Sequence, residues 1–251
     1  MRSVVSPTAG LSPRRISRLG CLALLWSLPL LASAQAAFDH SAWDALLREH
    51  VVVAEGGAAS SVDYRSLSAS RSTLDVYLLR ASRLAREDFE LWSLDDQLAF
   101  LINLYNAATV ALILEHTPGI ESIRDIGGLF SSAWNQERVA LFGDRVTLDE
   151  IEHDMIRGWG RYEEPRIHFA VNCAAIGCPA LRAEAYPGAA LEMQLEDATR
   201  RFLGDRSRNR LEGRRLWVSS IFKWYREDFE RGWGGSDSLE QFLARYASEL
   251  G

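Results

Sequence analysis

Lysine is nearly absent from this chain. Lys223 is the only lysine, and arginine supplies every other basic side chain. Without a lysine cluster, the sequence offers neither a lysine general base nor a lysine anchor for phosphates, and we interpret Lys223 as surface charge. Internal repeats, low-complexity tracts and proline-rich linkers are lacking too. A chain of 251 residues with 47% hydrophobic composition therefore predicts one sizeable domain.

The chain also lacks net positive charge, since its formal net charge is −6. Removing residues 1–34, which carry four arginines and no acidic residue, takes that charge from −6 to −10. An acidic surface argues against nucleic acid and against anionic lipid as partners. A small-molecule or peptide-like ligand is the partner we expect, and the sequence does not set the oligomeric state.

The N-terminal segment is typical of a secretory signal peptide. A basic stretch that includes Arg14 and Arg15 precedes an apolar run, Leu19 to Leu31, and small residues around Ala34 form a cleavage site. The apolar run is short for a membrane span, so we expect no stable span after its removal. We therefore predict a signal peptide over residues 1–34 and a periplasmic or secreted protein.

The remaining chain divides into an N-terminal helical region, residues 35–92, and a core, residues 93–251. The strongest predicted helix, Leu94 to Glu115, is apolar nearly all round and has Ser93 as its N-cap, which predicts a helix buried in the centre. Turn residues at Gly143-Asp144 and Glu212-Gly213 predict two hairpins. Other predicted elements are helices over residues 41–53, 70–85, 147–157, 191–203, 221–229 and 239–247, and a strand over residues 167–171. The expected fold is α+β, a helix-rich single domain with short antiparallel strands.

Cys173 and Cys178 are the only cysteines outside the predicted signal peptide. An exported pair this close could form a disulfide that closes a small loop. Alternatively, Cys173 is a free nucleophile activated by an imidazole or a helix N-terminus. A zinc site with both cysteines and a histidine fits standard ligand spacings poorly. The motif leaves these alternatives open.

Two histidines are candidate bases for Cys173. His153 stands between Glu152 and Asp154 on a predicted helix, where carboxylates favour the imidazolium form, although it could equally be a partly exposed helix residue. His168 lies on the predicted strand, whose alternation places its side chain on the face opposite Cys173. His153 is therefore the better base, and His168 the better structural donor.

Asn103 and Asn106 share one face of the buried helix, because they are three residues apart. A buried amide without partners costs on the order of 2 kcal/mol, so both amides must find hydrogen bonds. They either cap a neighbouring loop from inside, or one of them orients a catalytic imidazole. Trp224 and Tyr225 are candidates for a pocket wall.

Several segments together resemble the bacterial members of the domain of unknown function 547 family. They are residues 100–107, which include Asn103, Tyr105 and Asn106, residues 151–153, residues 168–179 and residues 222–229. The resemblance covers about Leu94 to Phe229. The resemblance implies that the first cysteine and the Glu-His pair are more important for function than the second cysteine. This favours Cys173 over Cys178 and His153 over His168, and it weakens the interpretation that the disulfide is obligatory.

The function expected from these residues is that of an exported thiol-dependent hydrolase or acyltransferase for a peptide-like or thiol-containing small substrate, without a cofactor or metal. Cys173 would attack a carbonyl, His153 would carry the proton, and Asn106 or Glu152 would hold the ring. Backbone N–H groups of Ala174 to Gly177 would stabilise the oxyanion. Substrate-binding candidates are Asn103, Tyr105, His168, Trp224 and Tyr225.

Any likeness to thiol peptidases is one of residue types, because the order Asn, His, Cys differs from that of papain-like enzymes. The alternative function is a non-enzymatic module that binds a glutathione-like ligand or a peptide and has a structural or redox cysteine pair. A structural exported scaffold is a third class.

Overall fold

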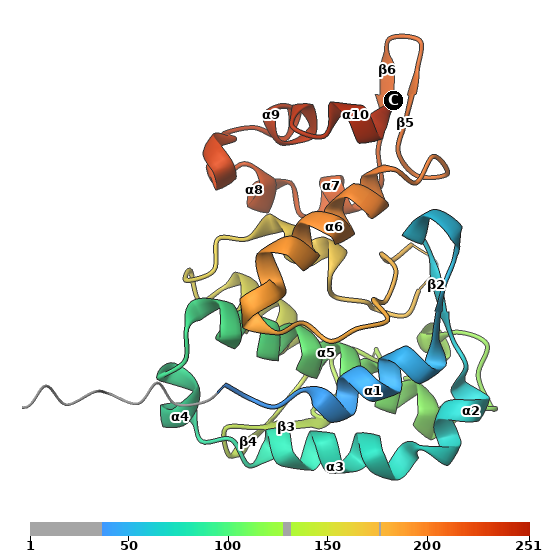
Figure 1. The fold of residues 1–251 in the computed structure, drawn as a ribbon, viewed down its shortest axis with the longest axis vertical. Helices are drawn as coiled ribbons and strands as arrows, with labels where there is room; N and C mark the ends of the chain where they lie inside the picture. Colours follow the sequence, from blue (N-terminus) through green and yellow to red (C-terminus); the bar gives the residue numbers. More distant parts are fainter. Residues whose placement is uncertain (1–36, 128–131, 176) are drawn as a thin grey trace, which may run out of the picture. The chain divides into compact units, whose positions relative to one another are not determined.

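The computed structural model describes residues 37–127, 132–175 and 177–251 (Figure 1). The predicted signal peptide, residues 1–34, lies outside the described residues. Residues Ala34 to Gly251 form one compact unit. Helices dominate the described part of this unit, and its strands pair as three separate antiparallel hairpins, β1–β2, β3–β4 and β5–β6. The fold is therefore of the predicted α+β, helix-rich class.

Helix α5 (Leu94–His116) is the central element, as the sequence predicts. The Ser93 hydroxyl accepts a hydrogen bond from the Asp96 N–H at 3.1 Å and so caps its first turn. Among the described residues, α5 alone is long and apolar enough to cross a membrane, but 94% of that stretch is buried inside the protein. Its all-round apolarity therefore serves the core of the domain.

The N-terminal helices pack on one side of α5 (Figure 1). Trp43 and Tyr77 stack with ring centroids 6.1 Å apart, inside a cluster that includes Ala107 and Val110 of α5. The first helix ends at His50 and not at residue 53 as predicted, because the β-branched run Val51–Val53 pairs with a second strand. The elements of this region are α1 (Ser41–His50), β1 (Val51–Val53), η1 (Glu55–Gly57), β2 (Ser60–Val62), α2 (Tyr64–Ala69), α3 (Arg71–Ser82) and α4 (Arg86–Glu90).

Beyond α5 and η2 (Ile123–Asp125), a hairpin of β3 (Val139–Leu141) and β4 (Asp144–Val146) leads into a helix. The turn is Phe142-Gly143, with φ of 54° and 89°, one residue earlier than predicted, because Leu141 pairs with Asp144. A capping box, the Thr-x-x-Glu pattern of Thr147 and Glu150, begins this helix. Glu150 N–H donates to the Thr147 hydroxyl at 2.9 Å, and Thr147 N–H donates to the Glu150 carboxylate at 2.6 Å.

The helix that follows is unusual. η3 (Glu150–Arg157) is a π-helix, a rare conformation that occurs often at functional sites. It packs on α5. Its wider turns change which side chains share a face, compared with an α-helix.

The predicted strand over residues 167–171 is wrong, because the segment begins as a 3₁₀-helix, η4 (Pro165–Phe169). Pro165 occupies the first turn, where no N–H is needed, and the Glu164 carboxylate caps it by accepting from the Arg166 N–H at 3.0 Å. The strand alternation that separated His168 from Cys173 is therefore absent.

The C-terminal part packs around a third cluster, rich in phenylalanine, that includes Phe169, Phe202, Phe222, Phe229 and Phe242. Helix α6 has the predicted bounds. The helix predicted over residues 221–229 breaks at Tyr225, whose φ of −118° and ψ of 27° are not helical. The elements are η5 (Gly188–Ala190), α6 (Leu191–Leu203), β5 (Arg210–Glu212), β6 (Arg215–Trp217), α7 (Ile221–Trp224), α8 (Arg226–Phe229), η6 (Trp233–Gly235), α9 (Leu239–Ala244) and α10 (Ala247–Leu250).

Candidate functional site

A cavity of about 160 Å³ lies between η3, η4, the loop after η4 and α7. Its walls combine apolar side chains with a few polar groups, which is typical of small-ligand sites. Six of the candidate site residues predicted from the sequence line this cavity: Glu152, His168, Cys173, Cys178, Trp224 and Tyr225. The other four predicted candidates are not part of the lining: Asn103, Tyr105, Asn106 and His153.

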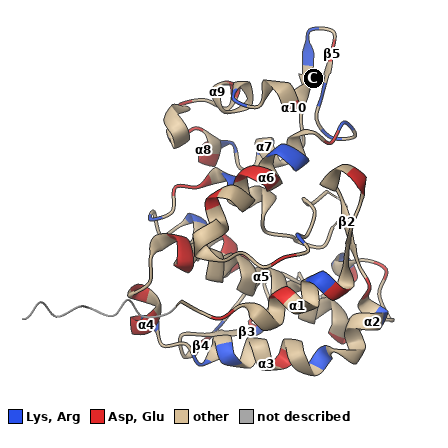
Figure 2. Cartoon of the chain, in the orientation of Figure 1, with Lys and Arg blue, Asp and Glu red and all other residues tan. Residues whose placement is uncertain are grey.

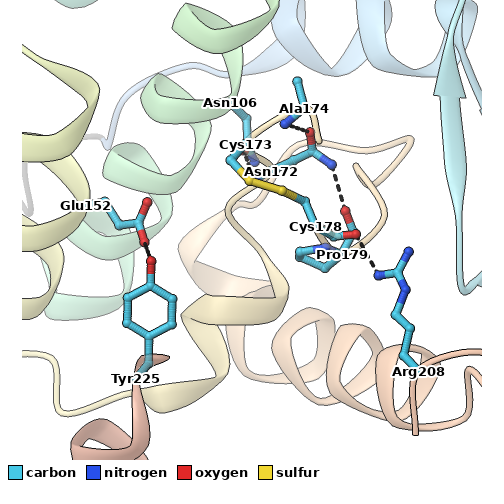
Figure 3. Close-up of a disulfide and its surroundings, with 9 residues drawn as sticks. All are labelled: Asn106, Glu152, Asn172, Cys173, Ala174, Cys178, Pro179, Arg208 and Tyr225. Atoms are coloured by element: carbon cyan, nitrogen blue, oxygen red, sulfur yellow. Dashed lines mark hydrogen bonds between the residues drawn. A yellow bond between two sulfur atoms is a disulfide. The ribbon is translucent and has the colours of Figure 1, made fainter. Parts of the chain in front are cut away.

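The two cysteines form a disulfide in the wall of this cavity, with their Cα atoms 6.0 Å apart (Figure 3). Cys173 is therefore not a free thiol in this state, and the structure has the disulfide that was one of three alternatives. No group of three or more His, Cys, Asp or Glu side chains able to hold a metal ion occurs in the described part of the chain.

Asn172 holds the disulfide loop in shape. Its amide donates to the Pro179 carbonyl at 2.7 Å and accepts from the Ala174 N–H at 2.9 Å (Figure 3). Ala174 has a φ of 55°, a left-handed conformation that is uncommon for a residue with a Cβ. Among the backbone donors expected for an oxyanion, the Ala174 N–H is thus already occupied in this state.

The two asparagines of α5 hold neighbouring backbone from inside. Asn106 donates to the Ala170 carbonyl at 3.0 Å and accepts from the Asn172 N–H at 2.8 Å. Asn103 does the same to the carbonyl and N–H of Tyr186, at 2.7 and 3.0 Å. Both amides are therefore satisfied by backbone and not by an imidazole. Asn106 therefore fixes the backbone just before Cys173.

His168 is buried in the cavity wall and paired with Asp228. Its Nε2 lies 2.7 Å from Asp228 Oδ2, and its ring stacks on Tyr225 with centroids 3.9 Å apart. A carboxylate only accepts, so Nε2 carries the hydrogen and Nδ1 is the nitrogen left to act as a base. Burial lowers the pKa of His168, although the hydrogen bond and charge of Asp228 work in the opposite direction. Burial therefore favours the neutral form of the ring.

Asp228, the partner of His168, is the residue of this candidate site that the sequence does not identify. Burial alone would raise its pKa, but hydrogen bonds from His168 and Arg157, together with the positive charge of Arg157, outweigh burial and hold the pKa well below its usual range. Arg157 Nε donates to Oδ2 at 2.6 Å. The available signal was an acidic residue next to the core residue Phe229, in the stretch from Phe222 to Phe229.

His153, the predicted base, contacts Arg157 and is not part of the cavity lining. Its Nδ1 accepts a hydrogen bond from Arg157 Nη1 at 3.0 Å, and 39% of its side chain is exposed. The chain of contacts then runs from Arg157 to Asp228 and from Asp228 to His168. The structure thus brings His168, and not His153, into the cavity wall that contains Cys173.

Glu152 supplies a buried carboxylate to the same wall. The Tyr225 hydroxyl donates to it at 3.0 Å (Figure 3). Tyr105 lies beside it, and burial together with the Glu152 carboxylate raises the pKa of Tyr105 well above its usual value. Glu152 and Tyr225 therefore form a polar pair within the wall. Trp224 is 66% exposed although it also lines the cavity, so its ring reaches solvent.

Fold and site together define a helix-rich α+β domain with a disulfide in the wall of a small cavity. Residues 89–203 match the family model described as "Protein of unknown function, DUF547". The match covers a little under half of the chain, and it agrees with the family resemblance predicted from the sequence motifs. The matched residues include Asn106, His153, His168 and both cavity cysteines. No curated protein and no solved structure matches the chain.

Proposed function

We propose that the protein is an exported thiol-dependent hydrolase or acyltransferase in which the Cys173–Cys178 disulfide is the resting form. The observation that carries this proposal is that Cys173 lines one cavity with His168, whose ring is held from behind the wall by the buried Asp228. Export to the periplasm or to the exterior is part of the proposal and rests on the N-terminal sequence. His168 replaces His153 as the base.

Activation requires that the disulfide be opened by a dithiol. The dithiol gives up two electrons and two protons, closes to its own disulfide, and leaves Cys173 and Cys178 as thiols. A sulfur in the wall of a cavity is accessible to such a reagent, and thiol–disulfide exchange depends on this access.

Acyl transfer then follows in two steps. The Cys173 sulfur attacks the substrate carbonyl while His168 Nδ1 takes the thiol proton, and the same nitrogen returns this proton to the leaving group. Water, or an acceptor nucleophile, then releases the acyl group from Cys173. The lowered pKa of His168 supports this assignment, because a neutral imidazole is a base and an imidazolium is not. Asp228 holds the ring and its tautomer.

The lining supports a peptide-like substrate that carries a carboxylate. Arg124 is an exposed side chain at the cavity, and no ion pair joins it to any described carboxylate. Trp134 and Trp224 contribute aromatic surface to the same cavity. An Arg beside apolar walls is suited to a ligand with one carboxylate and an apolar side group.

The disulfide itself favours a second candidate, a non-enzymatic module. In that case the bond stays closed, and the cavity binds a small carboxylate-bearing ligand without a covalent step. The two candidates differ in one observable, which is whether Cys173 ever becomes acylated.

Intact-mass measurement after incubation with p-nitrophenyl acetate tests the proposal. We expect no acetyl group on the oxidised protein, and one acetyl group on Cys173 after dithiothreitol treatment and removal of the reductant. Cys178→Ser should be acetylated without reduction, and Cys173→Ala should never be acetylated at this position. Acetylation that is equal with and without reductant, or absent from Cys178→Ser, would refute the enzyme and leave the binding module.

A further inference from the structure

The hairpin β5–β6 and the turn before it, residues 205–217, are the basic exception on an acidic chain. This segment, here called the arginine hairpin, has a net charge of +3 in a chain whose net charge is −6. Figure 2 shows basic positions on a hairpin that extends away from the helices around it. Its arginines are Arg206, Arg208, Arg210, Arg214 and Arg215.

The hairpin is firmly attached at its base. Asn209 is fully buried, donates to the Phe202 carbonyl at 2.7 Å and accepts from the Ser219 N–H at 3.0 Å. A lone two-stranded hairpin is only marginally stable in water, so this buried connection to the end of α6 is what fixes it. The hairpin thus projects from the domain but is held at its base by buried hydrogen bonds.

Apolar side chains lie among the arginines. Leu211 and Leu216 are 51% and 40% exposed and face each other across the strands, so both lie on one side of the hairpin. Trp217 is 49% exposed and lies on the opposite side of the hairpin, where it pairs with Arg210, whose guanidinium lies 5.9 Å from the indole ring centre. Large apolar groups at these exposures lose free energy in water and gain it when covered.

We propose that the arginine hairpin docks the protein on the surface of an anionic phospholipid bilayer. Arginines pair with lipid phosphates, tryptophan prefers the membrane interface, and leucines enter the boundary between headgroups and acyl chains. Three apolar side chains on a narrow hairpin are too few for the roughly 1,200 Å² or more that a specific protein interface buries. A bilayer needs no such area, because each side chain inserts separately.

The acidic net charge does not oppose this docking. Surface charges are screened beyond about 8–10 Å at physiological ionic strength, so a projecting basic tip meets the lipid before the acidic body does. Arg214 and Arg215 stand at the turn end, and neither forms an ion pair with a described residue. The net charge of the whole chain argues against anionic lipid as a partner, but the arginine hairpin has the opposite local charge.

Co-sedimentation with vesicles tests the proposal on residues 34–251, a compact unit that lacks the apolar run Leu19–Leu31. Vesicles contain phosphatidylcholine alone or with about 30% phosphatidylglycerol, a fraction that gives a negative surface potential. We expect binding only to anionic vesicles, and loss of it when salt rises to about 0.5 M. The double variant Arg214→Gln/Arg215→Gln should bind about 30-fold more weakly, since each arginine contributes about fivefold.

The matched control is Arg65→Gln/Arg83→Gln, which removes the same charge from two exposed arginines outside the hairpin. It should leave vesicle binding within about threefold, because screened distant charges contribute little. Trp217→Ser should weaken binding about tenfold at unchanged charge. Equal losses in both double variants, no binding to anionic vesicles, or binding of a single-stranded oligonucleotide in place of vesicles would each overturn the proposal.

Discussion

Replacing Asn106 with alanine tests how the backbone before Cys173 is held. The Asn106 amide is the hydrogen-bond partner of the Ala170 carbonyl and of the Asn172 N–H, at 3.0 and 2.8 Å. Asn106 is buried at the centre of the domain, so water does not replace the amide without a cost. Both backbone groups lose their partner in Asn106→Ala.

The magnitude follows from these two groups. A buried backbone group left without a partner costs about 1–3 kcal/mol, and Asn172 is only half-buried, so we expect a loss of about 3 kcal/mol in the free energy of unfolding. The same change should loosen the disulfide loop, because Asn172 also bonds Ala174 and Pro179.

Asn103→Ala is the control, one turn earlier on the same helix. It orphans the N–H and carbonyl of Tyr186, which are also buried, so its cost in a denaturant titration should be similar. The second readout is the rate at which dithiothreitol reduces the disulfide under native conditions. Asn106→Ala should be reduced faster than Asn103→Ala at comparable stability. A loss below about 1 kcal/mol, or equal reduction rates in the two variants, would refute the reasoning.

Three further predictions concern stability. The half-buried His40 has a pKa lowered by burial to about 4, so the unfolded chain takes up a proton before the folded protein does as the pH falls from 7 to 5. About 1–2 kcal/mol of stability should therefore be lost over this range. His40→Gln should reduce this pH dependence of stability in parallel denaturant titrations. Cys178→Ser should lower the free energy of unfolding by about 2 kcal/mol, because the bond closes a loop of sequence separation 5 and shorter loops constrain the unfolded chain less; an unchanged midpoint would contradict this. Arg166→Met should lower the free energy of unfolding by about 3 kcal/mol, because the buried guanidinium lies 2.7 Å from Glu164 Oε2 and its loss leaves that carboxylate poorly solvated. An unchanged stability in calorimetry would show that the ion pair is dispensable.

Much of the architecture follows from local sequence signals. Ser93, Thr147 and Glu150 cap helices as their positions predict, and the all-apolar pattern of α5 identifies a buried helix. The signals fail where a long-range contact or an uncommon helix decides the local conformation. The apolar run at residues 167–171 has the composition of a strand, but the turn set by Pro165 and its cap makes a 3₁₀-helix.

The site shows the same division. The sequence identifies Cys173 and Cys178 because cysteines are rare here, and Asn106 because a buried amide needs partners. It does not identify Asp228, since its place beside His168 depends on how α8 folds back against η4. Choosing between His153 and His168 depended on a strand that is not present, because residues 165–169 form a 3₁₀-helix.

Acetylation kinetics in the Cys178→Ser background test the central assignment most directly. The rate of p-nitrophenol release is compared for Cys178→Ser alone and with either His168→Asn or His153→Asn added. We predict a fall of about 100-fold or more with His168→Asn, as for loss of a general base, and a change within about threefold with His153→Asn. An equal fall for both histidines, or no fall with His168→Asn, would contradict the assignment of His168 as the base for Cys173.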